Sequence, residues 1–205
     1  MGNEAVGPLP LDVDAWDAWS PAEAQRHLDG VDTAWYVAVG WALDLFLGRP
    51  TRAHQDLEIG VPADRFGEVR AALDDLEFVV IGEGQAWPIA ESTLAAHRHT
   101  WGRERSGGPW RIDVFREPWK GDEWTYDRNR RIRMPAEDLI SYTVEGIPFA
   151  RPEVVLLLKA RAPRAKDATD FATVLPHLNA DQRRRLHDAL TLVHPGHPWL
   201  EALAG

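Results

Sequence analysis

Residues 35–61, WYVAVGWALDLFLGRPTRAHQDLEIGV, combine two strand patterns and a helical pattern in one short stretch. The first part, up to Gly40, is rich in aromatic and β-branched residues, which predicts a short strand. WALDLFLG then predicts a brief helix that ends at Gly48. The last part alternates apolar and polar residues, which predicts another strand with one buried face. The stretch therefore predicts a strand, a glycine, a helix and a strand in succession.

Asp56 and Glu58 are the unusual feature of the second strand. Residues i and i+2 of a strand point to the same face, about 7 Å apart at a rise of about 3.3 Å per residue. The two carboxylates thus converge on one face while Leu57 and Ile59 enter the core. Asp113 has a similar setting in GPWRIDVFRE, a later strand that could lie beside the first. Three acids around one point repel one another, which indicates a cation site.

Magnesium is the cation that fits this pattern. Its preferred ligands are carboxylate oxygens, water and substrate phosphates. Two such ions about 3.5–4 Å apart stabilise both the attacking and the leaving oxygens of a phosphoryl displacement. Gly40, between a strand and a helix N-terminus, stands where backbone N–H groups would hold a triphosphate. A D-x-E pair alone is weak evidence, but the ordered combination is far more specific.

This order of elements resembles the nucleotidyltransferase superfamily related to DNA polymerase β, and in particular the aminoglycoside and lincosamide nucleotidyltransferases and their bacterial relatives. Residues 35–61 are similar to that family's Gly-Gly-Trp-x-x-Asp stretch, which is followed by Thr-Arg-x-His-x-Asp-x-Asp/Glu. GIPFARPEVVLLLKARAPRAKDATDF, residues 146–171, is similar to its helical tail. The resemblance covers most of the chain, from about Asp32 to Phe171.

The resemblance assigns roles to the three acids. It implies that Asp56 and Glu58 hold the metal ions. It also implies that Asp113 either completes the metal site or acts as general base, and its geometry must decide which.

The resemblance also implies a nucleotide-binding set. Gly40 would line the phosphate pocket, Arg52 would lie near the nucleotide, and Lys159 would reach it from the helical part. One position departs from the family pattern, because the first glycine of its pair is Val39 here. Valine has less freedom than glycine to let the backbone approach a phosphate.

The main hypothesis is an enzyme that uses Mg²⁺, with two ions expected. It would move a nucleoside monophosphate from an NTP, with ATP expected, to a hydroxyl of a small, aminoglycoside-like acceptor and release pyrophosphate. One alternative is a nucleotidyltransferase-type toxin acting on tRNA or protein, which a similar Lys…Lys-Asp-x-x-Asp pattern favours. Another is a non-catalytic nucleotide-binding or ligand-binding relative, which Val39 favours.

The composition narrows the expected partners and compartment. The 205 residues include no cysteine, which excludes disulfides and thiolate metal sites and favours a reducing, cytoplasmic compartment. The formal net charge of −9 argues against a general attraction to nucleic acid and suits cationic small molecules or metal ions. No signal-peptide pattern and no membrane-spanning stretch is present. The expected partners are an NTP and a small acceptor, and the resemblance leaves a homodimer open.

We expect an α+β fold with two parts. Residues 12–134 would form a small mixed-sheet nucleotidyltransferase core with flanking helices, and residues 135–205 a C-terminal hairpin and helical domain. The hairpin ISYTVEGIPFA would turn at Gly146, and three helical patterns follow from Pro152. Residues 84–108 fit either a strand pair or a partial helix.

Capping signals predict where three helices begin. Ser20 and Glu23 form a capping-box pattern before the first helix. Pro62 predicts the start of the helix PADRFGEVRAAL, and Asn179 predicts the N-cap of the last helical pattern.

Several polar residues have more than one interpretation. Asp44 would position a metal ion or an arginine, or be an ordinary exposed helix acid or ion pair. His54 would touch substrate, but a hydrogen bond that holds the turn before the strand is favoured. Lys159 would bind phosphate or extend to solvent from a helix end.

Other clusters are assigned to structure or left open. Lys166, Asp167 and Asp170 lie at helical spacing, which favours an internal salt-bridge cluster over catalysis. The histidines of HRH, residues 97–99, and HPGHP, residues 194–198, lack the acid or spacing of a structural zinc site. Aromatic walls suit a sugar ring or a flat ligand. Five tryptophans near the middle of the chain would border an acceptor pocket: Trp87, Trp101, Trp110, Trp119 and Trp124.

Overall fold

The computed structural model describes residues 7–204. Contacts between residues divide the chain into two units. Unit 1 comprises the chain up to Trp35 together with Gln55–Trp119, and unit 2 comprises Tyr36–His54 together with the chain from Lys120 onward. The two units are therefore interleaved in sequence, whereas the predicted division at residue 134 is a single cut.

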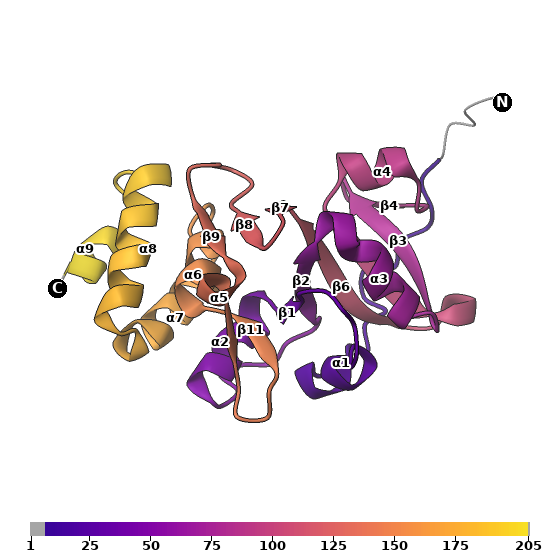
Figure 1. The fold of residues 1–205 in the computed structure, drawn as a ribbon, viewed down its shortest axis with the longest axis horizontal. Helices are drawn as coiled ribbons and strands as arrows, with labels where there is room; N and C mark the ends of the chain where they lie inside the picture. The colour runs from indigo at the N-terminus through magenta and orange to yellow at the C-terminus, as the bar shows by residue number, and fades with distance from the viewer. Residues whose placement is uncertain (1–6, 205) are drawn as a thin grey trace. The chain divides into compact units, whose positions relative to one another are not determined.

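Unit 1 is built on a mixed sheet, as predicted (Figure 1). Its strands lie in the order β2 (Glu58–Pro62), β6 (Trp110–Glu117), β5 (His99–Glu104), β3 (Leu76–Gly82) and β4 (Gln85–Trp87). The pair β2–β6 is parallel, and the pairs β6–β5, β5–β3 and β3–β4 are antiparallel. The predicted neighbourhood of the two acid-bearing strands is thereby confirmed.

The helices of unit 1 agree with the sequence patterns except at Pro62. Ser20 and Glu23 form the predicted capping box of α1 (Pro21–His27). Pro62 does not begin a helix but ends β2, where it still pairs with β6. Its φ of −58° and ψ of 130° suit a strand end, where no N–H is needed. A 3₁₀ turn (Ala63–Arg65) follows, and α3 runs over Phe66–Ala72.

Residues 84–108 contain a short helix and two strands, but the strands each pair with β3 and not with each other. The strands β4 and β5 occupy its two ends, and the short helix α4 (Glu91–Ala96) lies between them. A 3₁₀ turn (Arg105–Gly107) then leads to β6.

One face of the unit 1 sheet forms the core, because the strand register aligns its apolar residues. Ile59 pairs with Val114, and Ile112 lies opposite Gly102. A Cβ at Gly102 would lie 2.7 Å from the Phe78 ring, so glycine makes room for that ring. The helix α3 covers this face (Figure 1). Its Phe66 ring meets the Phe78 ring edge to face, with 5.7 Å between the ring centroids.

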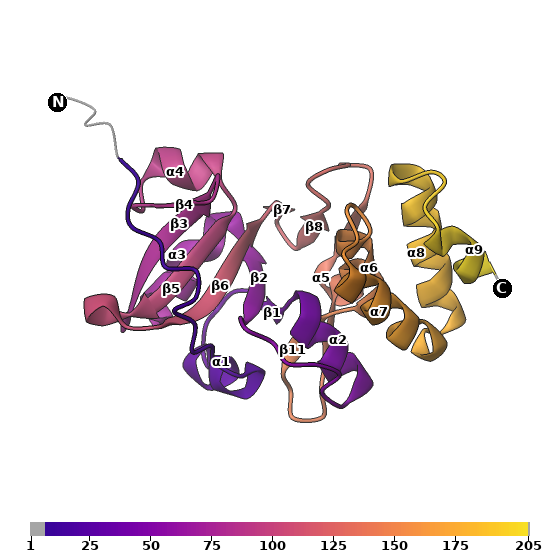
Figure 2. The same cartoon turned by 180° about the vertical axis from the view of Figure 1, so that it is seen from behind.

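The segment before α1 crosses the opposite face of the same sheet (Figure 2). Leu9 N donates to the carbonyl of Ala86 in β4, and the N–H of Trp110 in β6 donates to the carbonyl of Ala15. Trp16 contacts Trp101 at 4.8 Å between ring centroids. The segment thus contacts β4, β5 and the beginning of β6, the strand that carries Asp113.

Unit 2 contains a small sheet and a separate strand pair. The small sheet has the order β10 (Ile140–Tyr142), β11 (Pro148–Ala150) and β1 (Tyr36–Val37), with β10–β11 antiparallel and β11–β1 parallel. Gly146 has a φ of 85° in the β10–β11 turn, which confirms the predicted hairpin. The strands β8 (Glu123–Thr125) and β9 (Arg133–Pro135) pair antiparallel, and β7 (Trp119–Lys120) lies where the chain passes between the units.

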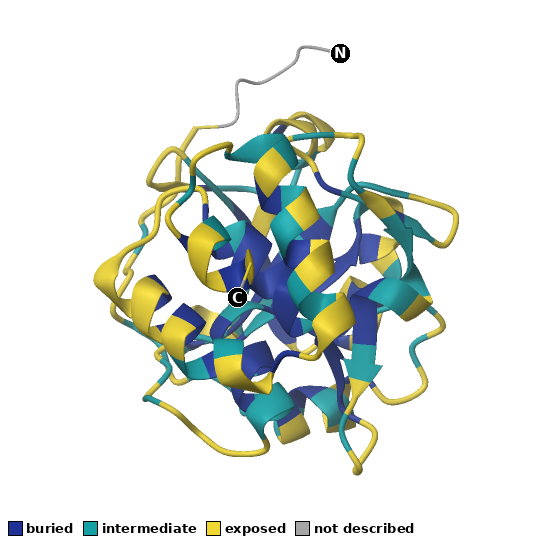
Figure 3. Cartoon of the chain, turned by 90° about the vertical axis from the view of Figure 1, so that its left-hand side faces the viewer, coloured by how far each residue is buried: buried dark blue, intermediate teal, exposed yellow. Residues whose placement is uncertain are grey.

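Helices make up the rest of unit 2. Some of them carry buried and exposed residues on opposite sides, as amphipathic helices around a core do (Figure 3), whereas no residue of α2 or α6 is exposed. The predicted brief helix is α2, which ends at Gly48 in the left-handed conformation. Asn179 is the predicted N-cap of α8, whereas no sequence pattern predicted α5 or α9. The helices are α2 (Val39–Leu47), α5 (Ala136–Leu139), α6 (Pro152–Lys159), α7 (Ala165–Val174, followed by the 3₁₀ turn Leu175–His177), α8 (Ala180–Val193) and α9 (Trp199–Ala204).

None of the helices within residues 7–204 is both long enough and apolar enough to cross a membrane.

Val39 begins α2 in a strained conformation. Its φ is 52°, in the left-handed region that L-residues avoid and that is exceptional for a β-branched side chain. The residue before it, Ala38, offers no side-chain cap to the helix. Glycine would adopt this φ without steric cost. Valine at position 39 therefore differs both from the glycine of the family pattern and from the residue that this backbone conformation favours.

We expect Val39→Gly to stabilise the protein by about 1 kcal/mol. The strain relieved is about 1–3 kcal/mol, against about 0.5–1 kcal/mol of added backbone entropy in the unfolded chain. Urea unfolding of wild type and variant measures the difference. Val39→Ala is the control, because it keeps the Cβ and should show no such gain. A Val39→Gly protein less stable than wild type would contradict the strain.

Candidate active site

The register of β2 and β6 brings two of the predicted acids together. Glu58 and Asp113 are directly paired across the parallel strands, and the N–H of Asp113 donates to the carbonyl of Leu57 at 2.8 Å. Asp56 lies just before β2, which begins at Glu58. All three acids therefore belong to unit 1, at the start of β2 and on its neighbour.

Asp113 is buried, at 5% exposure, and only partly satisfied. Its Oδ2 lies 3.2 Å from Nδ1 of His99, whereas Oδ1 has no hydrogen-bond partner within the described part of the chain. Burial raises the pKa of Asp113, the interactions with His99 and with the Trp101 side chain lower it, and the charge of Asp56 raises it, with a net increase. Burial lowers the pKa of His99, but the hydrogen bond and the negative charge of Asp113 raise it by more. The pKa of His99 is therefore raised overall.

The donor chemistry of these acids fits Mg²⁺. An orphaned, buried carboxylate oxygen is costly unless a cation or donor reaches it. Of the residues that the structure describes, however, no three His, Cys, Asp or Glu side chains gather closely enough to form a complete metal site. Asp113 and Glu58 thus supply suitable oxygens on neighbouring strands without a preassembled cage, and Mg²⁺ commonly takes water and substrate phosphate as its other ligands.

A row of residues continues from the acids across the sheet. Asp113 is paired with Trp101 of β5, on the side away from Glu58. In the next row, His99 meets Phe115 edge to face at 4.4 Å between ring centroids. The acids of unit 1 therefore adjoin aromatic side chains on one face of the sheet.

Of the five tryptophans that the sequence placed near an acceptor pocket, Trp101 is the one paired with Asp113 across β5 and β6. Trp110 and Trp124 are almost fully buried, at 3% and 1% exposure, and serve the cores of their units.

In unit 2, the start of α2 requires a glycine at position 40. A Cβ at Gly40 would lie 2.5 Å from Nη2 of Arg52 and 2.7 Å from the His54 ring. These distances are too short for any side chain, so Gly40 lets Arg52 and His54 approach the helix backbone.

His54 holds the turn that follows α2, as predicted. Its Nε2 lies 2.7 Å from Oδ2 of Asp44, and Thr51 donates from Oγ1 to Asp44 Oδ1 at 2.5 Å. Trp41 stacks on the His54 ring at 4.5 Å. Asp44 is 4% exposed, so its interpretation as an exposed helix acid is wrong.

Arg52 links this turn to the helical tail. Its Nη1 lies 3.1 Å from Nδ1 of His54, which can accept when Nε2 carries the proton toward Asp44. Its Nε lies 3.4 Å from Oδ1 of Asp170 in α7. The guanidinium is thus oriented from both sides.

Lys159 lies at the centre of an ion-pair cluster in the tail. Its Nζ lies 2.8 Å from Asp167 Oδ1 and 3.0 Å from Asp170 Oδ2. Arg164 reaches Asp167 from the other side at 2.9 Å. Lys159 is 7% exposed, so it does not extend to solvent. The predicted internal salt-bridge cluster exists, but its lysine is Lys159, because Lys166 points outward and is exposed.

This cluster has a marked electrostatic signature. Burial would raise the pKa of Asp167, but hydrogen bonds from Arg164 and Lys159 outweigh it and hold the pKa well below its usual range. The Asp167 carboxylate therefore remains ionised at neutral pH, and the ion pairs of Lys159 with Asp167 and Asp170 tie α6 to α7.

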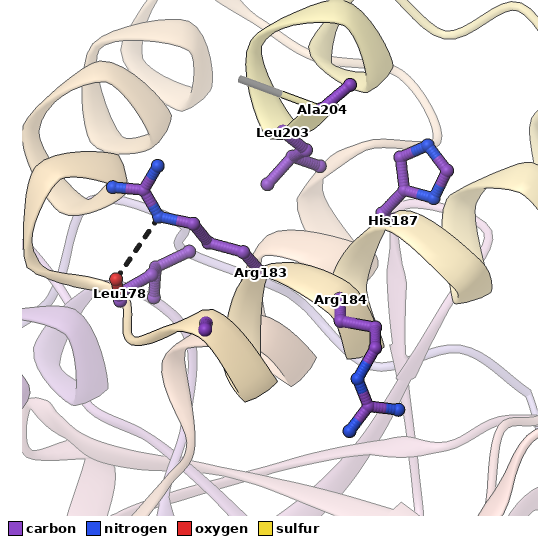
Figure 4. A pocket seen from close by; sticks show the side chains of 7 residues that line it. Leu178, Arg183, Arg184, His187, Leu203 and Ala204 are labelled. Atoms are coloured by element: carbon purple, nitrogen blue, oxygen red, sulfur yellow. Dashed lines mark hydrogen bonds between the residues drawn. The ribbon is translucent and has the colours of Figure 1, made fainter.

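A groove of about 670 Å³ elsewhere in unit 2 contains none of the predicted site residues (Figure 4). Arg183 crosses it and donates from Nε to the carbonyl of Leu178 at 3.2 Å. The other lining residues are Ala180, Arg184, His187, Leu203 and Ala204.

Comparisons with known proteins agree with this fold. Residues 22–97 match the family model aminoglycoside-2''-adenylyltransferase. The solution structure of the antibiotic-resistance factor ANT(2'')-Ia matches with a TM-score of 0.53 and 17% identity over 83% of this chain and 89% of that one. The lincomycin-bound lincosamide antibiotic adenylyltransferase LnuA matches with a TM-score of 0.50 and 18% identity over 75% of this chain and 90% of that one. The chain has the nucleotidyltransferase fold. No curated protein sequence matches it.

The predicted resemblance to aminoglycoside and lincosamide nucleotidyltransferases is thereby confirmed, as is the α+β fold class. The matching family model and the LnuA structure are of adenylyltransferases. Sequence analysis of this nucleotidyltransferase fold missed His99 as the partner of Asp113. Its only signal was the HRH sequence, which was considered for zinc alone.

We expect Lys159→Met to destabilise the protein by about 3 kcal/mol at neutral pH, because two buried carboxylates lose the ammonium between them and keep only Arg164 and Arg52 as cationic partners. The pKa of Asp167 is lower in the folded state, so its stabilisation exists above the unfolded pKa and is lost as pH falls through the folded pKa. The deficit of the variant should therefore narrow below about pH 4, where unpaired carboxylates protonate.

Urea unfolding across pH measures this effect. Lys166→Met is the matched control, and we expect it to change stability by no more than about 0.5 kcal/mol because Lys166 is exposed. Equal losses in the two variants would contradict the structural role of Lys159.

Proposed function

We propose that the protein is a Mg²⁺-dependent nucleotidyltransferase. It would transfer a nucleoside monophosphate from an NTP, with ATP expected, to a hydroxyl of a small antibiotic-like acceptor and release pyrophosphate. The observation that carries the proposal is the pairing of Glu58 with Asp113, whose buried Oδ1 lacks a partner within residues 7–204. The nucleotidyltransferase fold supports it independently.

Asp113 is the proposed general base. A carboxylate with a raised pKa accepts a proton more readily than an ordinary one, so it can take the proton of the acceptor hydroxyl. His99 holds Oδ2 and leaves Oδ1 available. Asp56 and Glu58 would hold Mg²⁺, which when bound supplies charge neutralisation on the triphosphate. The side chains of unit 1 thereby divide metal binding and proton transfer between them.

Gly40, Arg52 and Lys159 are the proposed nucleotide-binding residues of unit 2. Gly40 lets Arg52 approach the N-terminus of α2, where backbone N–H groups favour anions. Arg52 keeps its fixed orientation through His54 and Asp170. The Lys159 ammonium has three donors and two carboxylate partners, so one donor could meet a phosphate.

The acceptor is proposed to be a cationic small molecule. The net charge of −9 favours cations, and Trp101 beside Asp113 offers an aromatic surface for a ring. The matching family is named for transfer to the 2'' position of aminoglycosides, and LnuA was solved with lincomycin bound. We propose acceptors of these two chemical types first.

The ion-pair cluster weakens the alternative of a toxin. That alternative depended on the Lys…Lys-Asp-x-x-Asp pattern, and Asp167 and Asp170 are occupied by Lys159 inside the tail. The alternative of a non-catalytic binder keeps one observation in its favour, the valine at a position whose φ favours glycine.

We expect Asp56→Asn and Glu58→Gln each to reduce transfer by about 10²-fold or more, because each removes a negatively charged metal ligand without changing side-chain size. Pyrophosphate release from ATP with Mg²⁺ is measured against a panel of aminoglycosides and lincosamides. Titration calorimetry of ATP with and without Mg²⁺ measures binding in parallel.

Asp64→Asn is the control, because Asp64 is an exposed acid of the same unit. Circular dichroism checks that each variant remains folded. Undiminished turnover in either active-site variant would contradict the mechanism. Mg²⁺-dependent ATP binding with no turnover on any acceptor would instead favour the non-catalytic binder.

A further inference from the structure

Unit 2 contains a cavity of about 320 Å³ whose lining is mostly apolar. It lies among β9, α5, α6 and α8, and its volume falls in the range of small-molecule sites. The apolar part of the lining comes from β9 and the residue before it, from α6 and from α8, whereas α5 contributes only Asp138. It includes Ile132, Met134, Leu157, Leu186 and Ala189.

Glu153 is the exception in this lining. It lies in the first turn of α6 and is 4% exposed. Neither Oε1 nor Oε2 accepts a hydrogen bond within the part of the chain that the structure describes. A negative charge near a helix N-terminus is favourable, which accounts for an acid here but not for two unsatisfied oxygens. Burial raises the pKa of Glu153, whereas its own backbone N–H, the charges of Arg151 and Arg185 and the side chain of Gln182 lower it, with a net increase.

No charged group of the described lining forms an ion pair with Glu153, although Arg185 is near enough for its charge to act on the carboxylate. Arg185 pairs with Asp138 at 3.0 Å, and Arg133 pairs with Glu123 at 3.7 Å. The remaining lining acid, Asp188, adds a second negative charge. The cavity therefore combines apolar walls with an excess of negative charge, and this combination suits a cation with an apolar body.

We propose that this cavity binds a small primary amine, with its ammonium group on the carboxylate of Glu153 and its hydrocarbon part against Leu157 and Leu186. An ammonium is the donor that satisfies both carboxylate oxygens and compensates the charge. The site is distinct from the acids of unit 1 and does not depend on nucleotidyl transfer. Water filling the cavity is the competing occupant, since ordered water also satisfies buried oxygens.

Benzylamine is the probe, and benzyl alcohol is its neutral counterpart of equal size. Calorimetric titration at mildly alkaline pH should show benzylamine binding to wild type, with benzyl alcohol about tenfold weaker or more. Glu153→Gln should reduce benzylamine affinity by about tenfold or more and leave benzyl alcohol unchanged. Glu201→Gln, an exposed acid on α9, is the matched control and should bind benzylamine as wild type does.

Two further measurements keep the test decisive if Glu153→Gln fails to fold. Ala189→Phe, at a half-buried lining position of α8, should fill the cavity and abolish binding of both probes. A crystal of wild type soaked with 4-bromobenzylamine should place bromine inside the cavity by anomalous scattering. Absence of benzylamine binding to wild type would overturn the proposal in favour of a hydrated cavity. Equal affinity of Glu153→Gln, or bromine located elsewhere, would overturn it as well.

Discussion

The parallel pairing of β2 with β6 is the constraint on which unit 1 depends. Its register sets Ile59 against Val114 on the core face, and by the same step it sets Glu58 against Asp113 on the other face. Because side chains alternate strictly along a strand, a slip of one residue would turn the acids toward the apolar core face and the core residues away from it. Burial of the apolar face therefore fixes the position of the candidate catalytic groups.

This coupling explains why so much of unit 1 could be predicted from the sequence. The alternation around Leu57 and around Asp113 is local, and it determines which residues share a face. The capping box at Ser20 and the helix end at Gly48 are also local signals, and the structure contains both. Pro62 was misplaced because the same residue suits a helix start and a strand end, and only pairing with β6 decides between them.

What the sequence could not supply was the choice of long-range partner. The spacing of Lys166, Asp167 and Asp170 indicated a cluster, but the cation at its centre comes from α6. Likewise, nothing local connects His99 to Asp113 until β5 lies beside β6. Such pairs depend on the fold as a whole, so periodicity can place each residue on a face without naming the group that it meets.

Val39 favours a protein that has lost catalytic activity, whereas Asp113 favours an active enzyme. A valine at φ 52° stores strain beside the proposed phosphate-binding backbone, and such strain persists only where the surrounding structure enforces it. A buried, partly unsatisfied Asp113 is also costly, and nothing in the core of unit 1 requires an acid there. Loss of function would allow an apolar residue at position 113 to relieve that cost. The acid with its paired Glu58 is the stronger indication, since it is difficult to account for without the chemistry, whereas the strained valine costs stability but leaves Gly40 and the helix N-terminus in place.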